Sequence, residues 1–406
     1  MTTRIALVVS GGGAKGAYAA GAIKYLVTQG CTRFDLYAGT STGALITTLA
    51  LAGGYREMEL RYTTGGIADY MQPLDLEGVR KYRGLVDSRP FRKTLEEVFT
   101  AQVAAQVFAV PAPQLILTAV QLRTGRLVYF HTGNPPADAR WTQPWETWQA
   151  FGRSNTAGES REQLLQVLQA SGSEPVKLPA VKLWLDADWY VDGGIRAYVP
   201  IKAALAAGAT ELFVVMHSAV NPDLTTPKAK VENFAGVVGQ TLEIVLANTL
   251  AMDLSQARAL ADGTEIENRI VAPLQPITGV GGGPNTFGRQ IFDRGFDDAK
   301  RVWGPLLDQR PDLKDHLTGG QPRRAGGPAP IARGGPRRAT MTEEPAAPAR
   351  KSAPRRNVAE AEAPDTELIG FWRPARRTRA RKKTAKKKTA KRSGAKAAAS
   401  KRRSGR

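Results

Sequence analysis

The chain contains few residues that could form disulfides or hold a metal: one cysteine and three histidines among 406 residues. Because Cys31 is the single cysteine, no internal disulfide can form, which is typical of proteins from a reducing compartment. His131, His217 and His316 do not cluster with Asp or Glu at the spacing of a metal site. We therefore expect no metal and no other cofactor.

Long hydrophobic runs are also missing. No stretch approaches the roughly 18 apolar residues of a transmembrane helix. The apolar run at residues 5–9 is shorter than the apolar region of a signal peptide and continues directly into a glycine-rich turn, which favours a buried strand. We expect a cytoplasmic protein without a signal peptide or a transmembrane helix, which could still associate peripherally with a membrane.

Charge is unevenly distributed along the chain. The net charge is +20, but residues 321–406 hold 26 of the 57 Lys and Arg and only 6 of the 37 Asp and Glu. The first 320 residues therefore carry 31 charges of each sign and are neutral. From about residue 319, Pro, Ala, Gly and Arg dominate and apolar periodicity stops. We expect an α/β domain over residues 1–318 and a disordered basic tail over residues 319–406.

The N-terminal part of the chain predicts alternating strands and helices. Short runs at residues 4–9 and 34–38 predict buried strands, and runs with a small or apolar face at residues 16–29 and 42–52 predict helices. Strand, helix, strand and helix at this spacing indicate a parallel, right-handed βαβ arrangement. The fold class is therefore α/β.

Further elements are predicted along the rest of the domain. A hairpin is expected around Thr124-Gly125, between strands at residues 114–120 and 127–130. Other strands are expected at residues 181–185, 188–191 and 211–216, and other helices at residues 201–207, 234–260 and 292–307. Residues 134–170 are rich in Trp, Gln and Ser and match no element, and they could cover a site.

The first motif is a turn after the first strand, Gly11-Gly12-Gly13-Ala14-Lys15-Gly16. Its glycines fit the G-x-G-x-x-G pattern of dinucleotide-binding folds, but that function requires an acidic residue at the end of the second strand, and Asp35 lies at its start. A Walker A loop is excluded because Lys15 is followed by Gly16 and not by Ser or Thr. The turn is either a simple tight turn or a set of backbone N–H donors suited to an oxyanion.

The second motif, Gly39-Thr40-Ser41-Thr42-Gly43, follows the second strand and matches G-x-S-x-G. Between a strand and a helix, this pattern is typical of a nucleophile elbow, in which small residues let the backbone double back and expose the serine. The following helix would direct its positive end towards Ser41. The other interpretation is a Gly/Ser turn that caps a helix.

A nucleophilic serine needs a base. His217 follows a predicted strand and is the one histidine that could serve, although a lone histidine at a strand end more often has no such role. Asp192, in Tyr190-Val191-Asp192-Gly193-Gly194, is the stronger candidate, because an aspartate on a glycine-supported turn can hydrogen-bond a serine hydroxyl directly. The same residues could also form an ordinary Asp-Gly hairpin turn.

Together, these motifs and their order resemble the patatin-like phospholipase family. The resemblance rests on the turn at residues 11–16, the Ser41 pentad and the Asp-Gly-Gly of residues 192–194, and it extends over roughly residues 4–310. It implies a three-layer α/β/α fold with a mainly parallel central sheet. It also implies a Ser–Asp dyad without histidine, in which Ser41 is the nucleophile and Asp192 is the base.

The resemblance implies roles for the glycines as well. Residues 11–16 would form the oxyanion hole, Gly39 and Gly43 would shape the elbow, and Gly193 and Gly194 would complete the proton-acceptor motif. The implied function is hydrolysis of a lipid or phospholipid ester, of phospholipase A or lysophospholipase type. Residues 134–170 follow no pattern of the family, so no lipid class is implied. The alternative is a non-catalytic lipid- or polyanion-binding protein that keeps the fold.

The basic tail allows three interpretations. It could be a solvated arm without a binding role, a tether to anionic membranes, or an arm that binds nucleic acid. Residues 368–372 (LIGFW) could insert into a membrane interface, whereas residues 382–388 (KKTAKKK) resemble histone-like tails. For a lipolytic domain we favour the anionic membrane as the tail's partner, with nucleic acid as the alternative.

Overall fold

A computed structural model of the chain describes residues 3–64, 72–82, 84–111, 113–136, 141–154, 156–186, 188–219, 234–260, 269–277 and 286–319. The predicted basic tail lies outside these residues, apart from Gly319. The predictions about its disorder and its partners therefore stay predictions. The predicted α/β domain contains all the elements that follow.

In the described part of the chain, the central sheet has nine strands, and seven of them form a continuous series in the order β11-β10-β1-β2-β5-β6-β7. The strands that run parallel to one another are β1 (Ile5–Val9), β2 (Leu36–Gly39), β5 (Gln114–Gln121), β10 (Glu211–Val215) and, at one edge, β11 (Ile270–Val271). The others are β6 (Arg126–His131) and β9 (Trp189–Asp192), both antiparallel to β5, with β7 (Glu146–Ala150) beside β6 and β8 (Val181–Lys182) beside β9. The sheet is therefore mainly parallel, as predicted.

The central strands are buried on both faces, which explains their continuous apolar sequences. Side chains alternate across a strand, so Ile5, Leu7 and Val9 pack into one core while Ala6 and Val8 pack into a second core on the opposite face. Each core needs its own layer of helices. The pattern of residues 4–9 thus accounts for a three-layer architecture.

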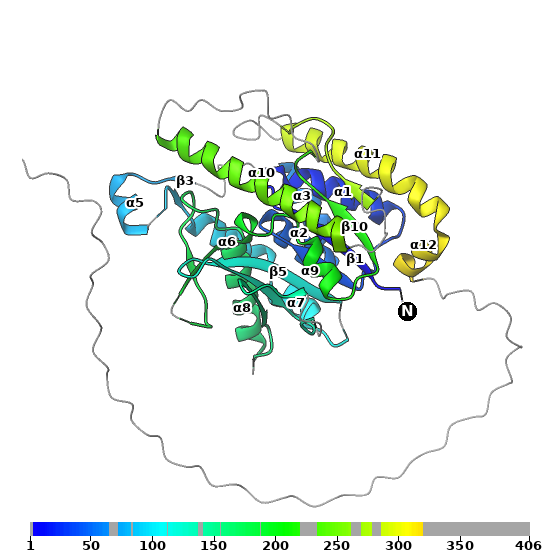
Figure 1. Ribbon diagram of the computed structural model, residues 1–406, viewed down its shortest axis with the longest axis horizontal. Helices are drawn as coiled ribbons and strands as arrows, with labels where there is room; N and C mark the ends of the chain where they lie inside the picture. The colour runs from blue at the N-terminus through cyan, green and yellow to red at the C-terminus, as the bar shows by residue number, and fades with distance from the viewer. Residues whose placement is uncertain are drawn as a thin grey trace, which may run out of the picture. The chain divides into compact units, whose positions relative to one another are not determined.

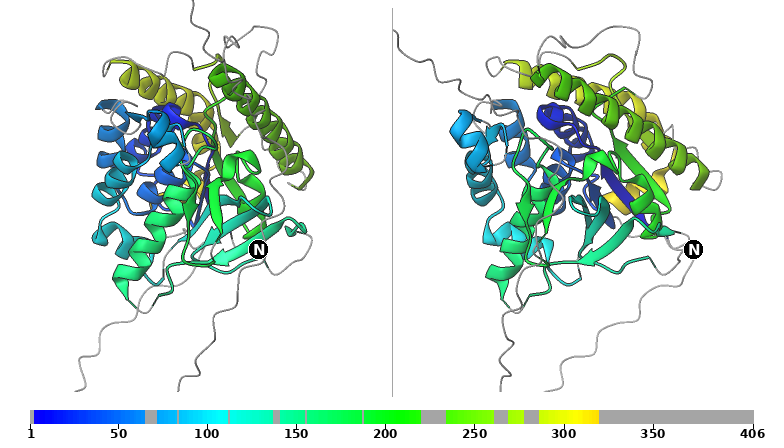
Figure 2. Two further views of the ribbon diagram at one scale, coloured as in Figure 1. Left: turned by 90° about the vertical axis from the view of Figure 1, so that its left-hand side faces the viewer. Right: turned by 60° about the vertical axis from the view of Figure 1, so that its left-hand side comes forward.

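Helices cover both faces of the sheet (Figures 1 and 2). The helices α1 (Gly16–Thr28), α2 (Thr42–Leu51), α8 (Ala157–Ser171) and α11 (Thr286–Gln309) pack into the first core, and α9 (Ile201–Ala206) and α10 (Phe234–Leu260) pack into the second. The remaining described elements are α3 (Tyr55–Thr64), α5 (Leu76–Tyr82), α6 (Arg89–Val98), α7 (Ala101–Val107), α12 (Pro311–Thr318), the short helices η1 (Gly13–Lys15) and η3 (Gly193–Ile195), and a small sheet of β3 (Gln72–Pro73) and β4 (Val86–Asp87). The predicted α/β/α arrangement is confirmed.

Most predicted elements are present, with shifted ends. The βαβ start, the 124–125 hairpin and the helix at 234–260 are confirmed. Three predictions need correction: the strand at 181–185 has only two residues, the last long helix begins at Thr286 and not at residue 292, and residues 134–170 contain β7 and most of α8. Proline at position 311 starts the short, unpredicted helix α12, where its missing N–H is not needed.

Candidate active site

The two glycine-rich turns meet at the carboxyl edge of the sheet. The strands β1 and β2 are parallel neighbours, and Val9 pairs with Gly39 at their last residues. The turn at residues 11–16 and the pentad around Ser41 follow these strand ends directly, so they lie side by side. This edge is where open α/β sheets usually bind ligands.

Ser41 has a strained backbone. Its φ of 56° and ψ of −128° lie in a region that side-chain-bearing residues rarely adopt, between the end of β2 and the start of α2. The two glycines of the pentad allow this sharp turn: a Cβ on Gly43 would lie 2.2 Å from the Val9 oxygen, and a Cβ on Gly39 would lie 2.4 Å from the Gly43 oxygen. The local geometry is that of an elbow that presents the serine.

The C-terminal end of α8 supports the backbone of Ser41 from the side. The backbone N–H of Ser41 donates to Ser171 Oγ at 2.9 Å, and Ser171 is fully buried. Two residues after Ser171, the backbone carbonyl oxygen of Ser173 accepts a hydrogen bond from the backbone N–H of Asp192 at 2.9 Å. The sequence pattern predicted no element over most of α8, and neither contact was predicted.

Asp192 ends β9 and faces Ser41. Its carboxyl group accepts from the backbone N–H of Gly194, with 2.7 Å between nitrogen and Oδ1, and lies near enough to the Ser41 side chain for that hydroxyl group to lower its pKa. Burial raises the pKa of Asp192 to about 7, against the opposing effect of these two groups. A carboxylate with this pKa can gain and lose a proton near neutral pH.

Hydrogen bonds between buried hydroxyl groups link the segments that hold Ser41 and Asp192. Thr118 Oγ1 donates to Thr40 Oγ1 at 2.8 Å, and Thr40 Oγ1 donates to the Ala197 oxygen at 2.8 Å. This links β5, the elbow and the segment that follows Asp192. A Cβ on Gly193 would lie 2.1 Å from Thr118 Oγ1, so a larger residue there would push the aspartate turn away from β5.

The turn at residues 11–16 has some backbone donors engaged and others open. Gly11 N–H donates to the Tyr198 oxygen at 2.9 Å, and the Lys15 and Gly16 N–H groups donate to the Gly12 and Gly13 oxygens within the turn. Within the described residues, no protein acceptor is found for the N–H groups of Gly12 and Gly13. Thr42 Oγ1 donates to the Gly13 oxygen at 2.8 Å and so ties the turn to the elbow helix.

A comparison with family models matches the stretch of sequence that forms this arrangement. Residues 7–205 match the model described as patatin-like phospholipase, and this range holds both turns and Asp192. The chain therefore contains a patatin-like phospholipase domain. The family is one of lipid hydrolases, and the mainly parallel sheet between two helical layers is its fold.

Comparisons with solved structures and with curated proteins give no further information about function. The solved structure of VipD from Legionella pneumophila is 14% identical, with a TM-score of 0.38, and the match covers 75% of this chain and 67% of VipD. That likeness is too low to carry functional information. No curated protein sequence matches the chain.

His217 supports the glycine turn of this patatin-like domain. It is fully buried, its Nδ1 lies 2.9 Å from the Gly11 oxygen, and its backbone N–H donates to Ser10 Oγ at 3.1 Å. Burial lowers the pKa of His217 to about 4, so the ring is neutral at pH 7 and donates its Nδ1 hydrogen to the Gly11 oxygen. A Cβ on Gly12 would lie 2.3 Å from Cγ of this ring.

The other two histidines have partners elsewhere. His131 Nδ1 is 2.9 Å from the Gly133 oxygen, and His316 Nε2 is 2.9 Å from Asp35 Oδ2, at the start of β2. The start of β2 is the edge of the sheet opposite Ser41. Among the described residues of the patatin-like domain, there is also no group of three or more His, Cys, Asp or Glu that could hold a metal ion.

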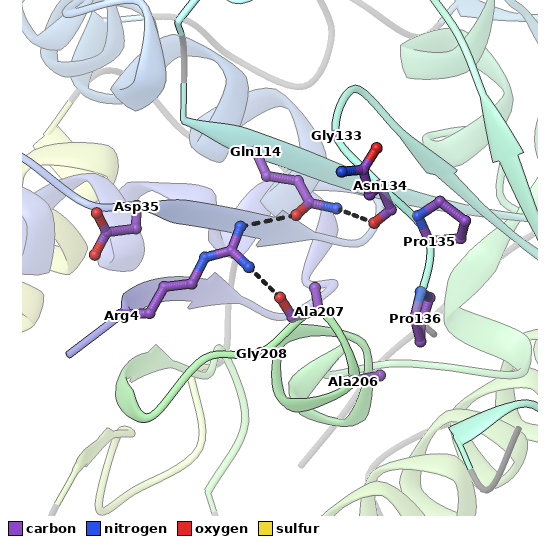
Figure 3. Close-up of a pocket in the computed structure, with 10 residues that line it drawn as sticks. All are labelled: Arg4, Asp35, Gln114, Gly133, Asn134, Pro135, Pro136, Ala206, Ala207 and Gly208. Atoms are coloured by element: carbon purple, nitrogen blue, oxygen red, sulfur yellow. Dashed lines mark hydrogen bonds between the residues drawn. The ribbon is translucent and has the colours of Figure 1, made fainter. Parts of the chain in front are cut away.

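A polar pocket of about 380 Å³ lies at that same opposite edge (Figure 3). Arg4 reaches into it from the start of β1 and donates to Gln114 Oε1 at 3.0 Å and to the Ala207 oxygen. Gln114 in turn donates to the Asn134 oxygen at 3.0 Å. Since the starts of β1, β2 and β5 form this wall, the pocket is separate from the turns that hold Ser41.

Proposed function

We propose that this chain is a serine-dependent lipid acyl hydrolase of phospholipase A or lysophospholipase type, with Ser41 as nucleophile and Asp192 as base. The observation that carries the proposal is the strained elbow at Ser41, with the buried carboxyl group of Asp192 near enough to the serine side chain for the two to interact. The match to a lipid hydrolase family supports the reaction class. The glycine turn beside the elbow supplies donors for an oxyanion.

The reaction would proceed in two steps. Ser41 Oγ attacks the ester carbonyl carbon while Asp192 takes its proton, and the tetrahedral oxyanion accepts hydrogen bonds from Gly12 and Gly13. Collapse of this intermediate expels the alcohol, which takes the proton from Asp192, and leaves an acyl-serine. A water molecule then attacks the acyl carbon while Asp192 takes its proton. The bond between the acyl carbon and Ser41 Oγ breaks, Ser41 recovers the proton from Asp192, and the fatty acid leaves.

The environment of Asp192 suits it to act without a histidine. An exposed aspartate has a pKa near 3.9 and is a weak base at neutral pH. Burial raises the pKa of Asp192 to about 7, which brings it close to the pH at which general bases work best. The Gly194 N–H holds one carboxylate oxygen, and the other is left to take the proton from Ser41.

The proposed oxyanion donors can be tested with a glycine-to-alanine change. In Gly12→Ala, the new Cβ would fall 2.3 Å from Cγ of the buried His217 ring, so the turn must shift and its N–H groups with it. Loss of one oxyanion donor typically raises the barrier by about 3 kcal/mol, so kcat for a soluble short-chain ester should fall by roughly 100- to 1,000-fold. Steady-state kinetics measures this.

A second glycine provides the matched control. Gly158, near the start of α8, has no atom within 4 Å of an added Cβ, so Gly158→Ala should keep the wild-type kcat. Thermal denaturation of both variants separates a local shift of the turn from unfolding. An unchanged kcat in folded Gly12→Ala would contradict the assignment of the turn as the oxyanion hole.

Covalent labelling tests the proposed function as a whole. A fluorophosphonate probe should modify the folded protein at one site per chain, and mass spectrometry of the digested protein should place the adduct on Ser41. Wild-type protein should also release fatty acid from phospholipid vesicles and from a short-chain nitrophenyl ester. Folded protein that takes no label and hydrolyses neither substrate would instead be a lipid- or polyanion-binding member of the family.

A further inference from the structure

Within the described part of the chain, the first half of α10 is an apolar helix that no other element covers fully. From Gly236 to Asn248, a stretch that the structure describes throughout, no side chain is buried. Six of these 13 residues are Val, Leu or Ile, and Glu243 is the one charged residue. A helix that is apolar on most sides is normally buried in a protein core or in lipid. Its exposure to solvent therefore needs an explanation.

The second half of the same helix is anchored to the domain. Thr249, Leu250, Leu254 and Ala257 are buried, and Asp253 Oδ2 accepts a hydrogen bond from the Val199 N–H at 2.8 Å. Contrary to the expectation from the sequence, residues 236–260 meet the criteria for a membrane span by length and composition, as the one such helix in the described residues. With its second half packed on the sheet, however, the folded helix has only its first half free to meet another surface.

The outward face of α10 also lacks the charges that solvent-facing helices carry. Residues 237, 241, 244, 248 and 252 follow one another at helical spacing and are Val, Thr, Ile, Asn and Met. Val237, Ile244 and Met252 are 49%, 60% and 57% exposed. In contrast, α11 carries surface ion pairs such as Arg289–Asp293 and Arg301–Asp298.

This apolar half lies beside the candidate active site. A Cβ on Gly194 would lie 3.4 Å from carbon atoms of both Leu246 and Tyr198, next to Asp192. From Leu246 the helix continues ten residues back to Gly236, a length of about 15 Å at 1.5 Å per residue. Figure 1 shows this end of α10 extending beyond the sheet.

We propose that the N-terminal half of α10 docks on the surface of a phospholipid bilayer, with Val237, Ile244 and Val245 inserted among the acyl chains. The proposal rests on the proposed function, since a lipid ester must leave its bilayer to reach Ser41. Exposed apolar patches of this kind mark interaction sites, and interfacial helices bind through buried apolar area. A lipid surface fits the position of the patch beside the catalytic residues and its near absence of charge.

Flotation with phosphatidylcholine vesicles tests the docking surface in the full chain. These vesicles carry no net charge, and 0.5 M salt screens any attraction from the basic tail. The double variant Ile244→Asp, Val245→Asp should bind the vesicles on the order of tenfold or more weakly than wild type. Leu122→Asp, at the β5–β6 hairpin, changes a side chain that is 52% exposed and should bind as wild type does.

Two further measurements separate this proposal from the proposed catalysis. The double variant should keep wild-type rates on a soluble nitrophenyl ester while losing at least tenfold in hydrolysis of vesicle phospholipid. Ser41→Ala should float with vesicles as wild type does, even though it cannot turn over. Failure of wild-type protein to hydrolyse the soluble ester would contradict the dyad and leave the docking result intact.

Other outcomes would overturn the docking proposal. Unchanged vesicle binding in the double variant would show that α10 does not contact lipid. Size-exclusion chromatography of both proteins would reveal whether the patch instead joins two copies of the chain. A wild-type dimer that becomes monomeric in the double variant, with vesicle binding unchanged, would assign the patch to that interface.

Discussion

Ser41→Ala is expected to lower kcat/KM for a soluble ester by about 10⁴-fold or more, because the variant has no hydroxyl to form the acyl-enzyme. The fold should persist, since the contact to Ser171 comes from the backbone N–H of Ser41 and is retained by alanine. Alanine also has the same backbone preferences at a φ of 56°. Initial rates and thermal denaturation of the two proteins check this result.

The matched control is Ser88→Ala. Ser88 precedes α6 and its side chain makes no capping hydrogen bond, so its removal should leave both the rate and the thermal midpoint unchanged. A Ser41→Ala protein that keeps a substantial fraction of the wild-type rate would eliminate Ser41 as the nucleophile.

Asp192→Asn is expected to lower kcat by roughly 10³- to 10⁴-fold, because the amide cannot accept the serine proton. The amide oxygen can still accept from Gly194 N–H, so the turn should keep its shape. Asp188→Asn is the matched control. That buried carboxylate accepts from the Trp189 N–H at 2.8 Å, in the same hairpin, and its loss should leave kcat near the wild-type value.

The pH profile gives a second measure of Asp192. Its pKa is raised to about 7, so the fraction of ionised base falls as pH falls through 7. Wild-type kcat/KM should therefore drop about tenfold per pH unit below that value and level off above it. The residual rate of Asp192→Asn should lack this dependence. A wild-type profile that stays flat from pH 5 to 8 would contradict Asp192 as the base.

Local patterns predicted the two turns well. The elbow and the glycine turn each depend on a few consecutive residues between a strand and a helix, and steric limits at Gly39 and Gly43 explain why small residues occur there. Parallel pairing of β1 and β2 then brings the turns together, which follows from the βαβ pattern. The short Asp-Gly-Gly turn was predicted by resemblance, and in the structure its buried aspartate is near enough to Ser41 for the serine hydroxyl group to lower its pKa.

The supporting contacts could not be predicted from the sequence because they join distant segments. Ser171 is 130 residues from Ser41, and His217 is 206 residues from Gly11. A lone buried histidine gives no local signal of what it contacts. In α8, the spacing of Leu164, Leu165 and Leu168 does indicate a buried helical face, and that signal was available. For α10, the apolar pattern predicted a helix but did not indicate which half of it is covered.

The wide separation of these contacts has a consequence for the chain during its synthesis. The elbow and glycine turn lie within the first 43 residues, but the proposed base comes at position 192 and the histidine behind the turn at position 217. The ribosome adds on the order of 10 residues per second, so roughly 15 seconds separate Ser41 from Asp192. A nascent or prematurely terminated chain that ends before residue 192 therefore contains Ser41 without the proposed base, and we expect it to have no ester hydrolase activity.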